Sequence, residues 1–281
     1  MWPRRSVWWY ILSRRGRLYP FQSSDVLLRM TSTPSHPRLL IVAATAAELA
    51  PVLEGMGYPA SHDLGLPSVR QGACLPLQAG VDVIVTGVGK SNAAMAMGAY
   101  FAAQRAMPGL IVNVGIAGTL SPAARIGDII VGVASVYGDE GVLTPNGFVG
   151  MGAAGFALGP FGDGGIACAE PSATRLSLAM AAIIGADRPA SVQRGAIATV
   201  SICSGTDAHA AMVAGHTGAI AEAMEGAAIA HACLRWGAAF VEVRAISNTT
   251  GDRDRQVWDM RVAKAGLRVI GEGLGAVFAG G

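Results

Sequence analysis

The chain has 281 residues, of which 52% are hydrophobic and 14% charged, enough apolar content for a sizeable core in one large domain. The formal net charge is only +2, and seven of the 21 basic residues fall within residues 1–38, where Asp25 is the single acid. The rest of the chain is therefore mildly acidic, which argues against a nucleic-acid-binding surface.

The N-terminal segment differs in composition from the rest of the chain. It is basic, contains the apolar run VWWYIL, and ends in the polar lead MTSTPSHP before the first strand-like segment. The apolar run is too short for a signal-peptide core, and longer uncharged stretches elsewhere are broken by Pro, Gly and Asn, so we expect no membrane span. We interpret residues 1–37 as an N-terminal extension, disordered or produced by an upstream start, and residues 38–281 as the folded domain.

The four cysteines are far apart with no C-x-x-C pair, and the five histidines lack the spacing of metal ligands. The sequence thus predicts no metal, no cofactor and no disulfide framework. Reduced thiols are typical of the cytoplasm, which is the expected location.

Apolar runs set the expected elements in chain order. Strands are predicted at residues 38–45, 81–89, 109–118, 127–136, 192–202 and 238–248. Helices are predicted at residues 46–57, 91–104, 173–186, 224–237 and 252–274. Continuous apolar strands alternating with helices indicate a layered α/β domain whose sheet is covered on both faces. The glycine-rich section 138–165 has no clear period and is predicted to be a loop region that could move over a site.

The segment TGVGKSN, residues 86–92, contains the Gly-Lys step of a phosphate-binding loop. A P-loop needs another glycine five places before Gly89, and Ile84 occupies that place inside the predicted strand. A β-branched residue cannot make the turn that glycine allows. The sequence therefore argues against a triphosphate loop and leaves two readings: a strand-to-helix turn that shapes a ligand site, or a tight turn with Lys90 in solvent.

Polar residues gather where the predicted strands end. Glu48 follows the first strand of the domain, the segments NVGIAG and RAISN close two others, and Glu225 opens an otherwise apolar helix. Because the carboxyl ends of strands line one edge of an open α/β sheet, we expect the two acids, Arg244 and Asn248 to converge there.

Several of these segments resemble a known family. NVGIAGTLSPAARIGDIIV, MEGAAIAHAC with FVEVRAISN, and AAEL at the first strand end are similar to the nucleosidases of the purine nucleoside phosphorylase superfamily, in the same order from about Arg38 onward. The resemblance implies a single three-layer α/β domain with a central twisted mixed sheet flanked by helices. It also implies a small-molecule nucleoside substrate, no nucleic-acid or membrane partner, and a homo-oligomer, either dimer or tetramer.

In the family pattern, a Glu after the first strand activates water, an Arg helps to hold that water, and a Met-Glu pair grips the ribose. An Asp in a Ser-Asp step protonates the purine, and the GIAG segment supplies backbone N–H groups and room for the sugar. The resemblance thus implies catalytic roles for Glu48, Arg244 and Asn248, and substrate contacts for Gly115, Ala117, Gly118, Met224, Glu225 and Ser247.

Asn248 and Ile116 depart from that pattern, which has Asp and Ser at these places. An Asn amide donates to a 6-oxo group, whereas an Asp carboxylate accepts from a 6-amino group, so Asn248 favours a hypoxanthine-like base. Together with the segment GDRDRQVWD, it makes the chain resemble the futalosine hydrolases, which release hypoxanthine from futalosine in the menaquinone route of some bacteria. Ile116 has no hydroxyl, so it cannot make the contact to the water that is expected of the Ser in the family pattern.

Other functions stay open at this point. A methylthioadenosine/S-adenosylhomocysteine nucleosidase and a 6-oxopurine nucleoside phosphorylase share the pattern, as does a non-catalytic nucleoside-binding protein of the same fold. Glu48 would place a negative charge beside an attacking phosphate, which disfavours phosphorolysis. The presence of both Glu48 and Glu225 disfavours a non-catalytic protein.

Overall fold

The computed structural model describes residues 9–12, 18–21, 39–59, 71–77, 80–103, 107–185 and 190–278. The chain divides into two units, Met1–Pro37 and Arg38–Gly281. In the first unit, β1 (Trp9–Leu12) pairs antiparallel with β2 (Leu18–Phe21). The prediction that residues 1–37 are disordered or follow an upstream start falls mainly outside the described residues and stays a prediction.

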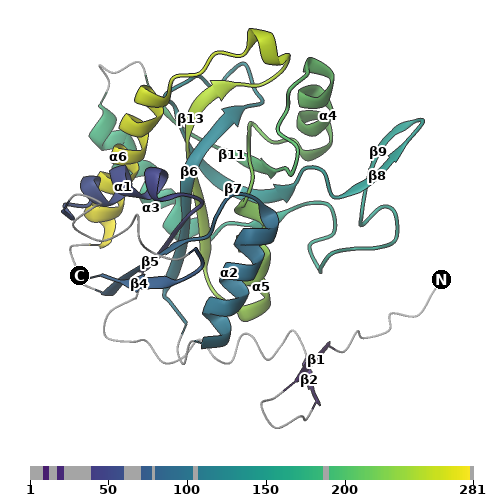
Figure 1. Cartoon of the computed structure of the whole chain (residues 1–281), viewed down its shortest axis with the longest axis horizontal. Coiled ribbons are helices and arrows are strands. Elements are labelled where there is room, and N and C mark those ends of the chain that lie inside the picture. Colours follow the sequence, from purple (N-terminus) through teal and green to yellow (C-terminus); the bar gives the residue numbers. More distant parts are fainter. Residues whose placement is uncertain are drawn as a thin grey trace. The chain divides into compact units, whose positions relative to one another are not determined.

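The second unit is built on a nine-stranded sheet with the order β10-β7-β11-β12-β6-β3-β5-β4, in which β13 pairs with both β6 and β7 (Figure 1). Its strands are β3 (Leu39–Ala43), β4 (Cys74–Pro76), β5 (Val81–Val85), β6 (Leu110–Thr119), β7 (Ile129–Tyr137), β10 (Ile166–Ala167), β11 (Val192–Thr199), β12 (Ala221–Ala223) and β13 (Phe240–Thr249). Parallel pairs join β3 to β5 and β6 to β13, while β12 runs antiparallel to β6, so the sheet is mixed. Every residue of β3 and β5 is buried, as expected of strands covered on both faces.

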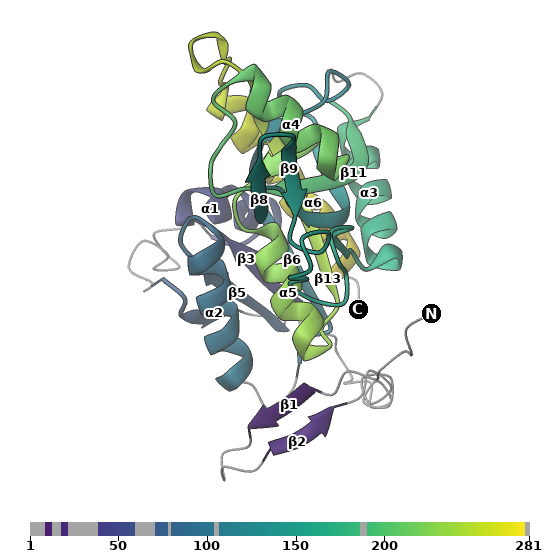
Figure 2. The same ribbon diagram turned by 90° about the vertical axis from the view of Figure 1, so that its right-hand side faces the viewer.

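Helices form a layer on each face of this sheet (Figures 1 and 2). On one face α6 (Met260–Phe278) packs against both α1 (Ala46–Gly55) and α3 (Glu170–Ile184), and on the other α2 (Lys90–Ala103) packs against α5 (Gly226–Trp236). A further helix, α4 (Asp207–Thr217), packs beside β11. The predicted α/β class, with a central mixed sheet flanked by helices, is confirmed.

Two large apolar clusters hold these layers together. The side chains of Leu49, Leu176 and Leu267, one from each helix of the first layer, join the sheet in one cluster. Phe101 of α2 and Ile229 of α5 belong to the cluster under the second layer. Burial of such side chains stabilises the fold by about 1.5–3 kcal/mol each before the entropy cost of ordering them.

The last helix begins later than the sequence pattern predicted. Residues 253–255 form a short 3₁₀ helix, and α6 begins at Met260 and not at residue 252. The chain before it folds back onto β13, because the Asp259 N–H donates to the Ser247 carbonyl at 2.9 Å. Asp259 then caps α6 by accepting a hydrogen bond from the Val262 N–H at 2.9 Å.

Several elements of the described residues lie outside the predicted set, among them the short strands β4 and β10 of the sheet. The glycine-rich section 138–165 contains an antiparallel hairpin, β8 (Gly141–Thr144) and β9 (Gly147–Gly150), that projects from the sheet in Figure 1. Helix α4 buries only Val213, so it carries no apolar period that a sequence pattern could reveal. Strand β12 has only three residues. Among the described residues, no helix is long and apolar enough to cross a membrane.

Candidate active site

A cavity of about 620 Å³ opens at the carboxyl ends of β6 and β13, between the first turn of α1 and the beginning of α6. Such strand ends are the usual ligand crevice of an α/β sheet. Seven of the nine predicted site residues line this cavity: Glu48, Ala117, Gly118, Met224, Glu225, Ser247 and Asn248. The other two, Gly115 and Arg244, contact residues of the lining. The structure thus brings the predicted set together from four segments that are distant in the sequence.

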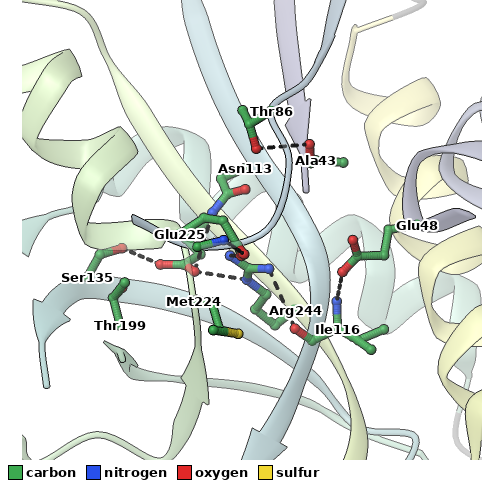
Figure 3. A network of polar contacts seen from close by, with 12 residues as sticks. Ala43, Glu48, Thr86, Asn113, Ile116, Ser135, Thr199, Met224, Glu225 and Arg244 are labelled. Atoms are coloured by element: carbon green, nitrogen blue, oxygen red, sulfur yellow. Dashed lines mark hydrogen bonds and ion pairs between the residues drawn. The ribbon is translucent and has the colours of Figure 1, made fainter. Parts of the chain in front are cut away.

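Glu48 lies in the first turn of α1, where its own backbone helps to place it. Thr45 caps the helix by accepting from the Glu48 N–H at 3.2 Å, and the Thr45 hydroxyl donates to Glu48 Oε2 at 2.8 Å. The other oxygen, Oε1, accepts from the Ile116 N–H at 3.1 Å (Figure 3). The carboxylate is therefore fixed from two sides at the cavity wall and keeps lone pairs for a further donor.

Arg244 lies behind this wall on β13 and is 1% exposed. Its Nε donates to Glu242 Oε1 at 2.9 Å and its Nη2 donates to Glu225 Oε2 at 3.3 Å, while Nη1 lies 3.5 Å from the Ile116 carbonyl (Figure 3). Burial alone would lower the pKa of Arg244, but the nearby carboxylates, Glu242 foremost, raise it, so the guanidinium stays charged. A fixed cation thus lies behind the wall and donates directly to Glu225, the predicted ribose ligand.

Gly115 explains how Glu48 and Arg244 come so close. A Cβ atom at this position would meet Nη1 of Arg244 and would lie 2.8 Å from Oε1 of Glu48. Two charged groups from different elements occupy the space that a side chain would fill. The glycine is therefore required by close approach and not by a turn.

Glu225 occupies the N-cap position directly before α5, yet its side chain does not cap that helix. The Ala227 N–H instead donates to Thr199 Oγ1 at 2.7 Å, which leaves the Glu225 carboxylate to reach across the sheet. There Oε1 accepts from the Gly89 N–H at 3.0 Å. The turn TGVGKSN therefore shapes this site, since Gly89 has φ +94° and offers its backbone N–H to the carboxylate.

Lys90, the cation of the same turn, is directed elsewhere. Its ammonium group pairs with Asp139 and lies 2.9 Å from Glu140 Oε1. It also lies 5.7 Å from the centre of the Tyr137 ring. A lysine neutralised in this way is not presented to a phosphate, and neither of the two readings left by the sequence placed it in an ion pair.

A β-bulge places Ser247 and Asn248 at the cavity. In the pairing of β13 with β6, Ile246 lies opposite Ala117 and Asn248 opposite Gly118, so Ser247 is the extra residue. Bulges re-aim side chains in this way beside ligand sites. The Asn248 carbonyl oxygen accepts from the Ser247 hydroxyl at 2.8 Å, and its amide donates to the Thr249 carbonyl at 2.8 Å. The second amide hydrogen and a lone pair of the oxygen remain for a ligand.

Met224 and Ala117 complete the predicted set. The Met224 sulfur lies 3.5 Å from the sulfur of Cys203, and both residues line the cavity. The Ala117 carbonyl faces the Ser247 hydroxyl at 3.2 Å. Met224 forms part of the apolar wall and Ala117 contributes its backbone. The charged side chains around them are the groups that can take part in a reaction.

Two further acids belong to the site although the sequence reasoning passed over them. Glu242 is fully buried, accepts from the Ser135 hydroxyl, and has a pKa raised by burial against the lowering effect of Arg244. Glu222 is 6% exposed and lines the cavity. The segment FVEVR could have revealed Glu242, because an acid two places before an Arg in a buried strand lies on the same face.

The arrangement suits the hydrolysis of a sugar derivative. A fixed carboxylate, Glu48, can orient water and accept its proton. The buried guanidinium of Arg244 places a positive charge beside Glu225. Glu225 can accept hydrogen bonds from two adjacent hydroxyls of a ligand, because each of its oxygens retains a lone pair.

Comparisons with known proteins identify the family of the chain. The Phosphorylase superfamily profile matches residues 38–270. Futalosine hydrolase of Acidothermus cellulolyticus is 35% identical over 85% of this chain and 91% of its own, and futalosine hydrolase of Streptomyces coelicolor is 35% identical over 82% and 91%. The crystal structure of 5′-methylthioadenosine/S-adenosylhomocysteine nucleosidase from Neisseria meningitidis superposes with a TM-score of 0.66 at 21% identity, over 85% of this chain and 99% of its own, and shows the same fold. The chain belongs to the phosphorylase superfamily, and within it to the family of the futalosine hydrolases.

Proposed function

We propose that this protein hydrolyses the N-glycosidic bond of futalosine and releases hypoxanthine. The observation that carries the proposal is the convergence of Glu48, Glu225 and Asn248 on one cavity, with buried Arg244 donating to Glu225. The 35% identity to two futalosine hydrolases supports the choice of substrate.

In the proposed reaction, Glu48 orients a water molecule toward the anomeric carbon and accepts one of its protons. Thr45 and the Ile116 N–H hold the carboxylate in place during this step. The transition state resembles an oxocarbenium ion, so the nearby negative charge also stabilises it. A positioned general base contributes about 10²- to 10⁴-fold to the rate.

Glu225 is proposed to accept hydrogen bonds from the two ribose hydroxyls, with Met224 against the sugar face. Arg244 and the Gly89 N–H already hold both Glu225 oxygens, so the carboxylate does not have to be ordered by the substrate. Preorganisation of this kind lowers the cost of binding.

Asn248 is proposed to read the base. Its free amide hydrogen can donate to the 6-oxo group or to a ring nitrogen of hypoxanthine, and Gly118, which lies opposite it, leaves room for the amide itself. The same proposal includes a place in the menaquinone route, a cytoplasmic location, a homo-oligomeric state and the absence of a nucleic-acid partner.

One assay tests the function. Futalosine, inosine, methylthioadenosine and S-adenosylhomocysteine are each incubated with the protein, with and without phosphate, and the free base and the sugar product are measured. We expect hypoxanthine from futalosine without phosphate. A strict phosphate requirement would indicate a phosphorylase, and preferred cleavage of methylthioadenosine would indicate a nucleosidase for adenine substrates.

A further inference from the structure

Asn248, the residue proposed to contact the purine base, cannot donate a proton to it. When the glycosidic bond breaks, the departing base takes the bonding electron pair and needs a proton or an equivalent charge. Asn248 has an amide, whose hydrogens are not acidic enough to be transferred. A different side chain therefore has to supply the proton if general acid catalysis operates.

Glu222 and Asn248 lie on the two strands that pair with β6 at Gly118. In the pairing of β12 with β6, Glu222 is opposite Gly118, and in the pairing of β6 with β13, Gly118 is opposite Asn248. Directly paired residues share one face of a sheet, so the carboxyl and the amide flank a position that carries no side chain. Both residues line the cavity. A Cβ atom at Gly118 would lie 3.0 Å from Asn248 Nδ2, so the missing side chain lets the amide lie close to this position, with Glu222 paired to it from the other side.

The Glu222 carboxyl is connected to the protein surface. Its Oε1 accepts from the Ser204 N–H at 2.8 Å, and the Ser204 hydroxyl donates to its Oε2 at 2.5 Å. The Ser204 hydroxyl oxygen also lies 3.1 Å from His209 Nδ1. Ser204 is 1% exposed, whereas His209 on α4 is half-buried. The three residues form a chain of hydrogen bonds from the cavity to solvent.

The electrostatics favour a protonated carboxyl at this place. Burial raises the pKa of Glu222, and the charge of Asp139 adds to this, while the hydrogen bonds from Ser204 and the proximity of His209 lower it; the net direction is upward. Cys203, a further titratable group close by, has a pKa raised mainly by burial and is neutral at pH 7.

We propose that Glu222 is a catalytic residue that donates a proton to the departing purine, and that Ser204 and His209 return the proton from solvent. This inference rests on the proposed nucleoside hydrolysis and adds the acid that Asn248 cannot be. It gives the two carboxyl groups different roles: Glu48 is the base on the water side of the cavity, and Glu222 is the acid on the base side.

Atoms and electrons balance in this step. Water gives its hydroxyl to the anomeric carbon and its proton to Glu48, while the carbon–nitrogen bond breaks and its electron pair goes to the base. Glu222 Oε2 transfers its proton to a ring nitrogen of that base and becomes a carboxylate. The Ser204 hydroxyl proton then moves to Glu222, His209 replaces it on Ser204, and solvent reprotonates His209. Glu48 returns its proton to solvent, so that one water is consumed per bond cleaved.

The test compares two leaving groups. Glu222→Gln should lower kcat on futalosine or inosine by about 10²-fold or more, since general acid catalysis is worth that much. On 4-nitrophenyl β-D-riboside, whose phenolate leaves without a proton, the same variant should stay within about threefold of wild type. Glu140→Gln, at a half-exposed acid outside this cavity, is the matched control and should leave both rates unchanged.

The pH profile gives a second readout. A general acid acts in its protonated form, so wild-type kcat/KM should fall as the pH rises through the raised pKa of Glu222, and the Gln variant should lose that alkaline decline. Ser204→Ala should lower kcat less than Glu222→Gln does. The variant keeps the acid Glu222 and loses only the hydroxyl through which Glu222 is reprotonated from solvent. Far-ultraviolet circular dichroism and the melting temperature establish that each variant is folded.

The outcomes separate this inference from the proposed function. Equal losses on both substrates, or a Gln variant that keeps the alkaline decline, would overturn the role of Glu222 and leave the hydrolase standing. Full activity of Glu222→Gln on futalosine would do the same. A folded wild-type protein that releases no base from any nucleoside would overturn the proposed function itself. If wild type does not cleave the nitrophenyl riboside, the pH profiles on futalosine decide.

Discussion

Arg244 and Glu242 lie two residues apart on β13 and form an ion pair that is almost completely buried, with Nε 2.9 Å from Oε1. A buried pair costs desolvation energy, and removing one partner leaves the other charge uncompensated. Arg244 also meets Glu225 at 3.3 Å, so the pair anchors the cation that the candidate site uses. The stability of the fold should therefore depend on this contact.

Glu242→Ala should lower the free energy of unfolding by about 3–5 kcal/mol, because it leaves a cavity and an undercompensated guanidinium. Urea denaturation followed by circular dichroism measures the change. Glu272→Ala is the matched control, since Glu272 Oε1 lies 3.7 Å from Arg268 Nε at the surface, where a pair contributes about 0–1 kcal/mol. Similar losses of unfolding free energy in the two variants would show that the buried pair stabilises the fold no more than the surface pair does.

Gly115→Ala should lower kcat by roughly 10²-fold while the protein still folds, because the added Cβ occupies the space of Arg244 Nη1 and Glu48 Oε1. Gly98→Ala in α2 is the control: a Cβ there meets no atom within 4 Å, and alanine stabilises a helix interior by about 0.5–1 kcal/mol. Turnover of both variants on futalosine checks the prediction. Wild-type activity in Gly115→Ala would mean that the acid and the cation can separate without loss.

Glu48→Gln should reduce kcat on futalosine by about 10²-fold or more and change KM little, because it removes the general base without changing the shape of the site. Glu54→Gln, in the last turn of the same helix and half-exposed beside Arg268, should leave the rate unchanged. Steady-state rates at saturating substrate distinguish the two. An active Glu48→Gln variant would remove this residue from the reaction.

Glu225→Gln should lower kcat/KM by about 10²-fold, because an amide replaces one oxygen that accepts from the Gly89 N–H or from Arg244. If Glu225 grips the ribose, the variant should discriminate less between a ribonucleoside and its 2′-deoxy analogue than wild type does. Unchanged discrimination would place the ribose hydroxyls elsewhere in the cavity.

The fold could be predicted because its strands are apolar along their whole length. Strands such as β3 and β5 are buried on both faces, so each appears in the sequence as a continuous apolar run. Such a run can be recognised without knowing which strands pair with one another. Helix α4 escaped prediction because it buries only one side chain. Its ends are set by capping residues, Thr206 and Gly218, which mark a boundary but do not by themselves indicate a helix.

The site could be predicted in part, because the carboxyl ends of strands share one edge of the sheet. That rule placed Glu48 and Asn248 at one crevice without any knowledge of strand order. It could not reveal the bulge at Ser247, since a bulge is defined by the partner strand. Nor could it reveal Glu222, whose position opposite Gly118 depends on the pairing of β12 with β6.

Base selectivity should depend on residue 248. Asn248→Asp should shift the preference of the protein from 6-oxo toward 6-amino purines, because the carboxylate accepts from an exocyclic amine and repels an oxo group. The amide now donates to the Thr249 carbonyl at 2.8 Å, so the variant also loses that contact and should be slower on both bases. A site that matches the hydrogen-bonding pattern of one kind of purine leaves a buried polar group unpaired when it binds the other kind. An unpaired group of this sort costs about 1–3 kcal/mol, which corresponds to roughly a ten- to hundredfold change in relative kcat/KM. Competition between inosine and adenosine, with both free bases measured, gives this ratio directly, and Ser247→Ala serves as the control that disturbs Asn248 without changing its donor. An equal loss on both nucleosides would show that residue 248 does not read the 6-position, and selectivity would then have to arise from the opposite edge of the cavity.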